Sequence, residues 1–249
     1  MPTYSEEELT EALAECAREP VHIPGAIQPA GCLVSLNADL TRVLQVSSNL
    51  QEFLGISVDE ALSHPPAHSL GEALITRLGT RLAADTGQIV LDDLQLSAGT
   101  DERCRATAYR SGSRVVVEIE LLGPLDELEI LTTVGHWQTC LAAQDSEAEL
   151  LQVLVEGVRA LTQYDRVMVY SFDAEWNGQV KAECLSDGID SLLGHRFPAS
   201  DIPSQVRALY DINPVRSIPD AKAKALSLVP EQCPQSGEPL DLSVGNLRA

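Results

Sequence analysis

The chain has 249 residues, 44% of them hydrophobic and 22% charged, which is typical of a globular protein of one or two domains. Its 17 Lys and Arg residues are outnumbered by 37 Asp and Glu residues, so the net charge is −20. A negative field of this size repels phosphate backbones and anionic lipid, and we expect neither a nucleic-acid partner nor a membrane partner. The acidic N-terminus and the lack of an apolar run of ~18 residues predict a soluble, cytoplasmic protein.

The cysteines and the sequence motifs give no sign of a metal site or an enzyme. None of the six cysteines forms a Cys-x-x-Cys pair, so we expect reduced thiols and no metal ion. The chain also lacks a Gly-x-Gly-x-x-Gly run, a phosphate-binding loop, a Gly-x-Ser-x-Gly run and a His-Glu-x-x-His run. We therefore predict no catalytic residues.

The N-terminal region combines a short helix with an extended segment. A capping box at Ser5 and Glu8 predicts an acidic helix that ends near Cys16. Residues 19–31 contain three prolines and two glycines, which excludes a helix. Because this segment is too apolar for a flexible linker, we expect it to lie across another part of the protein.

Short strands and small helices follow. Strands are predicted at 32–36, 43–46, 105–110 and 114–122, and helices at 50–54, 58–62 and 70–84. In the last strand the aliphatic residues alternate with Glu118 and Glu120. This period of two predicts an antiparallel strand with one face in water.

A second domain is predicted after Gly123. A helix is expected over 125–141, and a capping box at Ser146 begins another. Strands follow at 166–172 and 179–184, then a helix from 203 to 210, whereas 213–246 shows no periodicity. The predicted fold class is α+β, with two antiparallel sheets that each carry flanking helices.

Three blocks of sequence resemble bacteriophytochromes. Residues 16–31 (CAREPVHIPGAIQPAG) are similar to the N-terminal signature of that family. Residues 197–203 (FPASDIP), with NPVR at 213–216 behind them, are similar to its chromophore-pocket signature. Residues 164–173 (YDRVMVYSFD) form a third matching block. The resemblance covers essentially the whole chain.

The resemblance implies a domain plan and a function. Residues 1–31 would be an N-terminal extension that passes beneath a later loop and forms the family's knot. Residues 32–122 would be a PAS domain, and 123–249 a GAF domain whose C-terminal part is missing. The function implied is a red/far-red photoreceptor module that binds biliverdin covalently and signals by photoisomerisation of a bilin double bond. The helix over 125–141 would take part in a homodimer.

The resemblance also assigns site residues. Cys16 occupies the position of the cysteine that forms a thioether with biliverdin. The remaining pocket residues would serve in three ways: a backbone acceptor and stacking contacts for the pyrroles, cations for the propionates, and aromatic packing around the isomerising ring. Asp201, Ile202 and Pro203 would contact the pyrroles. Arg216 and Arg248 would be the cations for the propionates, and the aromatic residues would be Tyr170, Phe197 and Tyr210.

The chain departs from the family pattern in two places. Ala30 stands where the family's Ile-Gln-Pro-His-Gly run has histidine. In the family, the region after residue 249 supplies a pocket histidine and the last strands of the GAF domain. We therefore expect this chain to be a fragment, with a GAF sheet that is prone to aggregation.

Two other functions compete with the photoreceptor. One is a PAS–GAF module that binds another small ligand, or none, and serves for dimerisation. The other is a thiol enzyme with a Cys–His pair such as Cys16 and His22, although the proline-rich chain between them gives no reason for a hydrogen bond. Loss of covalent pigment on replacing Cys16 would separate the photoreceptor from the ligand-binding module, and thiol-ester or peptide turnover by the purified chain would favour the enzyme.

Overall fold

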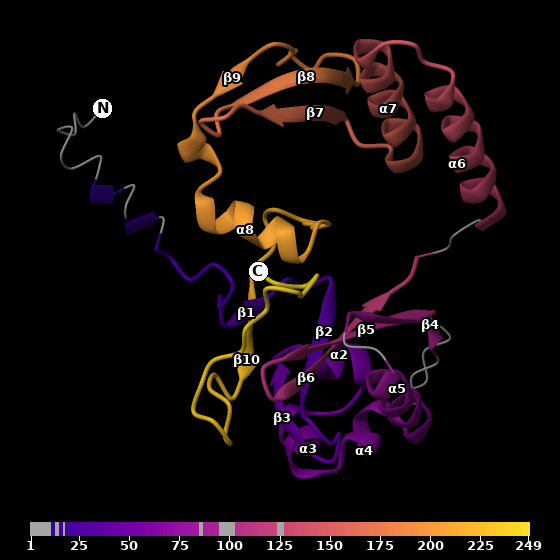
Figure 1. Ribbon diagram of the computed structural model, residues 1–249. Helices are drawn as coiled ribbons and strands as arrows, with labels where there is room; N and C mark the ends of the chain where they lie inside the picture. The colour runs from indigo at the N-terminus through magenta and orange to yellow at the C-terminus, as the bar shows by residue number, and fades with distance from the viewer. Residues whose placement is uncertain (1–10, 13–14, 17, 85–86, 95–102, 124–126) are drawn as a thin grey trace. The chain divides into compact units, whose positions relative to one another are not determined.

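The computed structural model describes residues 11–249 except 13–14, 17, 85–86, 95–102 and 124–126 (Figure 1). By its internal contacts the chain forms two compact units, one of Met1–Gly123 with Ser204–Ala249 and one of Pro124–Pro203. The predicted domain 123–249 is thus divided between the two units. The capping box at Ser5 lies outside the described residues. The α+β fold class is confirmed.

A seven-stranded antiparallel sheet forms the centre of the first unit, in the order β1-β10-β3-β2-β6-β5-β4 (Figure 1). The strands are β1 (Ala26–Ile27), β2 (Gly31–Asn37), β3 (Val43–Ser47), β4 (Ile89–Leu94), β5 (Cys104–Ser111), β6 (Arg114–Leu121) and β10 (Leu226–Val229). The strands predicted at the positions of β2, β3, β5 and β6 are confirmed, and they pair as two antiparallel hairpins. Strands β1, β4 and β10 are not among the predicted strands.

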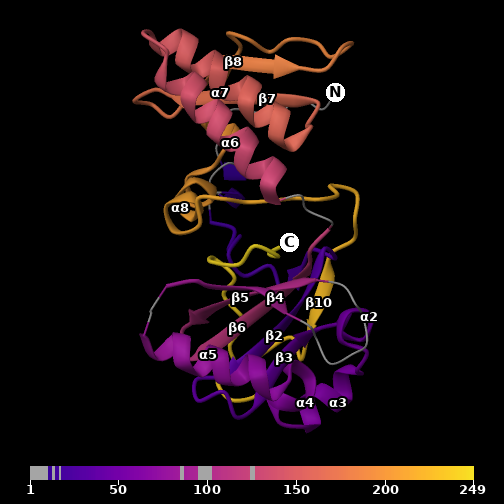
Figure 2. The ribbon, with the colours of Figure 1, turned by 90° about the vertical axis from the view of Figure 1, so that its right-hand side faces the viewer.

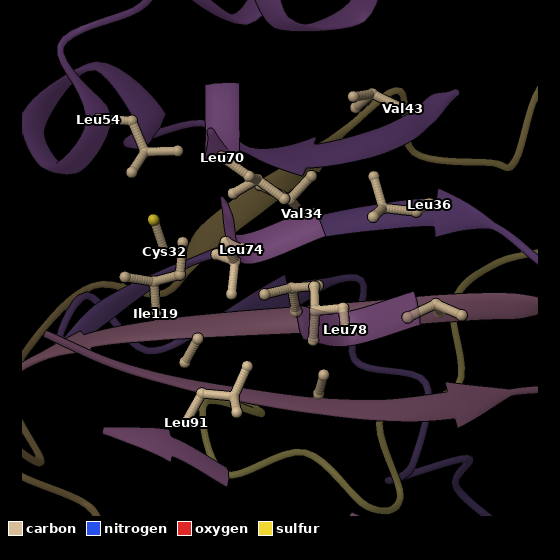
Figure 3. Close-up of a cluster of buried hydrophobic side chains, with 14 of the residues drawn as sticks. Cys32, Val34, Leu36, Val43, Leu54, Leu70, Leu74, Leu78, Leu91 and Ile119 are labelled. Carbon is tan, nitrogen blue, oxygen red and sulfur yellow. The ribbon is translucent and has the colours of Figure 1, made fainter. Parts of the chain in front are cut away.

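Four short helices cover one face of this sheet (Figure 2). They are α2 (Leu50–Leu54), α3 (Val58–Ser63), α4 (Pro66–Leu70) and α5 (Glu72–Ala84). Figure 3 shows Leu74 and Leu78 of α5 among the side chains of the strands, with Ile119 and Val34 in the same buried cluster. All but α4, which Pro66 begins, were predicted.

The opposite face of the sheet is largely covered, which corrects the prediction that Glu118 faces water. Glu118 has no exposed surface, and Glu120 is half-buried. Segments from the end of the chain cover this face and bury a second apolar cluster. Its members are Ile27, Leu33, Tyr109, Val116, Leu228, Leu240, Leu242 and Leu247. The alternating pattern was right, but what covers its polar face lies more than a hundred residues further along the chain.

The extended segment lies between two parts of the C-terminal region. On one side β1 pairs with β10, and on the other the Gln28 N–H donates to the Leu247 carbonyl at 2.7 Å. The Ala249 N–H completes this second edge by donating to the Ala26 carbonyl at 3.3 Å. The prediction that this segment lies across another part of the protein is confirmed. Helix α8 (Ser204–Ile212) also belongs to this unit.

The second unit is a three-stranded sheet, β7-β8-β9, on which α7 packs, with α6 packed on α7 (Figure 1). Its elements are α6 (Glu127–Ala142), α7 (Glu147–Thr162), β7 (Arg166–Phe172), β8 (Gly178–Leu185), β9 (Arg196–Phe197) and the 3-10 helix η1 (Ala199–Asp201). The Ser146 hydroxyl caps α7 by accepting from the Glu149 N–H, as predicted. In the described part of the chain, no helix combines the length and the apolarity needed to cross a membrane.

Candidate functional site

A cavity of about 320 Å³ in the first unit brings together three of the predicted site residues: Tyr210, Arg216 and Arg248. Helix α8 provides Tyr210, the loop after α8 provides Arg216, and the C-terminal segment provides Arg248. The rest of the lining is largely apolar and includes Val21, Val206, Leu209 and Ile218. An apolar pocket with a few convergent polar groups is typical of a small-molecule site.

The two arginines leave guanidinium nitrogens without partners. Arg216 Nη2 donates to the Arg248 carbonyl at 2.9 Å, which fixes the two residues together. The Nη1 atoms of Arg216 and Arg248 are buried, and neither has a hydrogen-bond partner among the described residues. Burial and the neighbouring Arg216 cation lower the pKa of Arg248. Two adjacent cations with unused donors favour an anionic ligand group, because buried charges need partners.

Two buried polar residues that sequence analysis had not assigned to the site hold the segment that carries Arg248. Gln28 Nε2 donates to the Arg248 carbonyl and to the Ser217 carbonyl, both at 3.0 Å. From the sheet beneath, Glu118 accepts the N–H groups of Asn246 and Leu247. Gln28 belongs to the first signature block, whereas the signal at Glu118 is the alternating pattern of its strand, which predicts solvent exposure.

Cys16 lies in the first unit as an exposed, free thiol. The helical residues 15–16 precede the extended segment, as expected. The Cys16 carbonyl accepts a hydrogen bond from the Gln205 side chain of α8, the helix that also carries Tyr210. An exposed thiol beside a cavity-lining helix is accessible to a reactive small molecule.

Five predicted site residues lie in the second unit, and two of them touch. The ring centroids of Tyr170 on β7 and Phe197 on β9 are 5.9 Å apart. A Cβ at Gly178 would overlap the Tyr170 ring, so this glycine lets the ring lie directly over β8. Gly178 is therefore the residue that allows the Tyr170 ring to lie in this position, next to Phe197.

The other three, Asp201, Ile202 and Pro203, form the end of η1 and the turn into α8. Asp201 is exposed, whereas Ile202 and Pro203 are half-buried. The Ala199 N–H donates to Asn177 Oδ1 at 3.2 Å and ties this loop to the β7–β8 hairpin. A loop held in this way presents its backbone in a defined conformation.

One Cys–His pair exists that sequence analysis missed. Cys140 Sγ and His136 Nε2 lie 3.6 Å apart, one turn from each other on α6. The pair is solvent-accessible, with no carboxylate contact to His136 among the described residues. Nor do the described residues contain a cluster of three or more side chains that would hold a metal ion.

Comparison with known proteins finds a matching family profile and similar proteins. The family profile described as a PAS fold matches residues 16–122. The chain is 37% identical over 244 residues to cyanobacterial phytochrome B of Nostoc and 32% identical over 257 residues to a bacteriophytochrome of Pseudomonas aeruginosa. Each alignment covers 95% of this chain but only 32% of the relative. The chain therefore spans about a third of the length of these relatives.

Two solved structures have a similar fold. The chromophore-binding domain of an R. palustris bacteriophytochrome is 40% identical, with a TM-score of 0.83. That of Stigmatella aurantiaca bacteriophytochrome is 36% identical, with a TM-score of 0.81. Each match covers 94% of this chain, and 77% and 78% of the respective structures.

Proposed function

Because this chain belongs to the phytochrome family, we propose that it is the bilin-binding part of a red/far-red light receptor. The observation that carries the proposal is the pair of buried Nη1 atoms of Arg216 and Arg248 in one cavity, neither of which has a hydrogen-bond partner in the described part of the chain. A linear tetrapyrrole carries two propionates, which are the kind of anion that such a pair binds. We assign no catalytic turnover to this chain.

The residues of the first unit fit a bilin. Arg216 and Arg248 would each offer a fork of donors to a propionate carboxylate. Tyr210, half of whose surface is exposed, and the apolar lining would contact the pyrrole rings. When bound, biliverdin supplies absorption of red light and a double bond that isomerises.

Cys16 is the proposed attachment point. Its thiol is free and exposed, and would hold biliverdin through a thioether to a vinyl side chain. For the second unit, the family signature assigns Tyr170, Phe197 and the backbone of the loop at 201–203 a role in bilin binding, and we propose this role as well. These assignments rest on the family signature, and the Tyr170–Phe197 contact supports the aromatic part.

We also propose that the protein works in the cytoplasm as a homodimer formed through α6. Several aliphatic side chains of this helix are exposed, including Leu128 at 75% and Leu131 at 69%. Monomeric proteins seldom leave apolar groups of this size together in water. A second α6 would cover them.

The experiment mixes the purified chain with biliverdin and records red absorbance, followed by a denaturing gel with zinc-induced bilin fluorescence. Cys16→Ser should abolish the fluorescent band, whereas Cys140→Ser, at another accessible thiol, should retain it. No red absorbance from the unmodified chain would contradict the proposal. A fluorescent band that survives in Cys16→Ser would place the attachment elsewhere.

A further inference from the structure

Glu118 is a carboxylate in the middle of the seven-stranded sheet. It lies on β6, opposite Leu33 of β2 and Thr107 of β5, and has no exposed surface. Among the described residues, no lysine or arginine forms an ion pair with it. A buried carboxylate without a cation is costly, so a role is needed to explain it.

Two of its hydrogen bonds come from the C-terminal segment. The Asn246 N–H donates to Oε2 at 2.8 Å, and the Leu247 N–H donates to Oε1 at 3.2 Å. The Tyr109 hydroxyl also donates to Oε1, at 3.3 Å. Each oxygen of the carboxylate therefore holds one backbone group of the segment.

The glycine at 245 makes this approach possible. A Cβ there would lie 2.6 Å from Glu118 Oε1 and 2.6 Å from the Tyr109 hydroxyl. Such a distance is too short for any side chain, so the segment can sit this close to the carboxylate only with glycine at this position.

The segment then leads directly to the anion-binding arginines. Arg248 follows Leu247, and its carbonyl accepts from both Arg216 Nη2 and Gln28 Nε2. The position of the Arg248 guanidinium therefore depends on a backbone clamped from two sides, by Gln28 and by Glu118.

We propose that Glu118 is a positioning residue for the anionic groups of the ligand: its ionised carboxylate clamps the backbone at 246–247 and so sets Arg248 beside Arg216. The ligand named here rests on the proposed function. Glu118 itself does not reach the cavity lining, so its effect passes through the segment.

Protonation should release this clamp. Burial raises the pKa of Glu118 to about 7, with a smaller contribution from Glu120 on the same strand, against the hydrogen bonds from Asn246 and Leu247. The other titratable groups around it are Tyr109 on β5 and, acting on Tyr109, Asp241 and Arg248 of the C-terminal segment. A protonated carboxyl has one good acceptor fewer, so one backbone N–H loses its partner.

The first test follows amide exchange at Asn246 and Leu247 in the ligand-free chain at about pH 8. In Glu118→Gln the amide group offers one acceptor where the carboxylate offered two, so at least one of these N–H groups should exchange about tenfold faster. Glu120→Gln is the matched control, since it removes a charge from the same strand and should leave both rates unchanged. Equal rates in Glu118→Gln and the unmodified chain would overturn the proposal.

The second test compares biliverdin with its dimethyl ester, which lacks the propionate charges. It uses a Cys16→Ser background, so that binding is reversible. Glu118→Gln should weaken biliverdin about tenfold and the ester less than about twofold. When the pH is lowered from about 8 to about 6, the chain that retains Glu118 should lose affinity for biliverdin but not for the ester. Equal weakening of both ligands would show a merely structural role and overturn the proposal, as would tighter binding of biliverdin at the lower pH.

A second variant covers the case in which Glu118→Gln fails to fold. Gly245→Ala keeps the carboxylate and displaces the segment from it, and should weaken biliverdin more than the ester in the same way. If neither the unmodified chain nor the Cys16→Ser chain binds a tetrapyrrole, the proposed function falls and the ligand named here falls with it. The exchange rates would still decide whether Glu118 holds the segment.

Discussion

At the scale of single residues, the ionisation of Glu118 links stability to pH. Burial raises its pKa in the folded protein to about 7, whereas the unfolded chain releases this proton near 4.5. Between these values the folded state holds more protons than the unfolded state, so stability falls as pH rises through this window. The clamp on 246–247 tightens over the same window because the ionised carboxylate is the better acceptor. Overall stability still falls, because the cost of burying the charge exceeds what the stronger hydrogen bonds return.

The predicted change is measurable by urea unfolding. A shift from 4.5 to about 7 corresponds to about 3 kcal/mol of unfolding free energy, lost between about pH 5 and about pH 8. Glu118→Gln should remove most of this slope and leave the smaller one from Glu120, whose pKa burial also raises. The pKa values of Glu60, Asp173 and Glu183 are lowered, so these groups change the unfolding free energy only at pH values below this range. An unchanged slope in Glu118→Gln would contradict the assignment.

At the scale of elements, local signals predicted most of the fold. The alternating aliphatic residues placed β6, and the serine cap placed the start of α7 at Glu147. What the sequence could not supply was the partner of each face. The pattern on β6 does not distinguish water from a distant segment as the cover for Glu118, because only tertiary packing decides that.

The candidate site shows the same limit. Family signatures pointed to Cys16, Arg216 and Arg248, and the structure places both arginines in one cavity. Spacing alone could not identify Gln28 or Glu118 as a support for Arg248. The hydrogen bond from Gln28 to Arg248 joins residues 220 positions apart, and the one from Leu247 to Glu118 joins residues 129 positions apart.

Helix α6 carries the element-scale prediction. If its exposed aliphatic residues form the dimer interface, Leu131→Glu places a charge where an apolar contact is needed and should yield a monomer. Leu193→Glu, at a residue 57% exposed in a loop of the same unit, is the control and should remain dimeric. Light scattering coupled to size-exclusion chromatography measures both masses. A dimeric Leu131→Glu protein would rule out this face of α6.

At the scale of the whole molecule, the first unit is completed by residues that follow the second unit in the sequence. Residues 226–249 bury one face of a sheet built mainly from residues 31–121, and residues 124–203 form the other unit between them in sequence. The first sheet is therefore completed only when the last segment of the chain has reached it. Its stability should depend on side chains that are remote in sequence.

Leu242→Ala tests this dependence. Leu242 is fully buried in the cluster with Leu33 and Val116, so the truncation should cost the first unit about 2–5 kcal/mol. The measurement is amide exchange of β2 and β6 in increasing urea, which reports this unit alone. Leu128→Ala, at a residue 75% exposed, should change the same amides by less than about 0.5 kcal/mol. Both tryptophans, Trp137 and Trp176, lie in the second unit, so their fluorescence follows that unit separately. If Leu242→Ala left exchange in β2 and β6 unchanged, the C-terminal segment would not be part of their cooperative core.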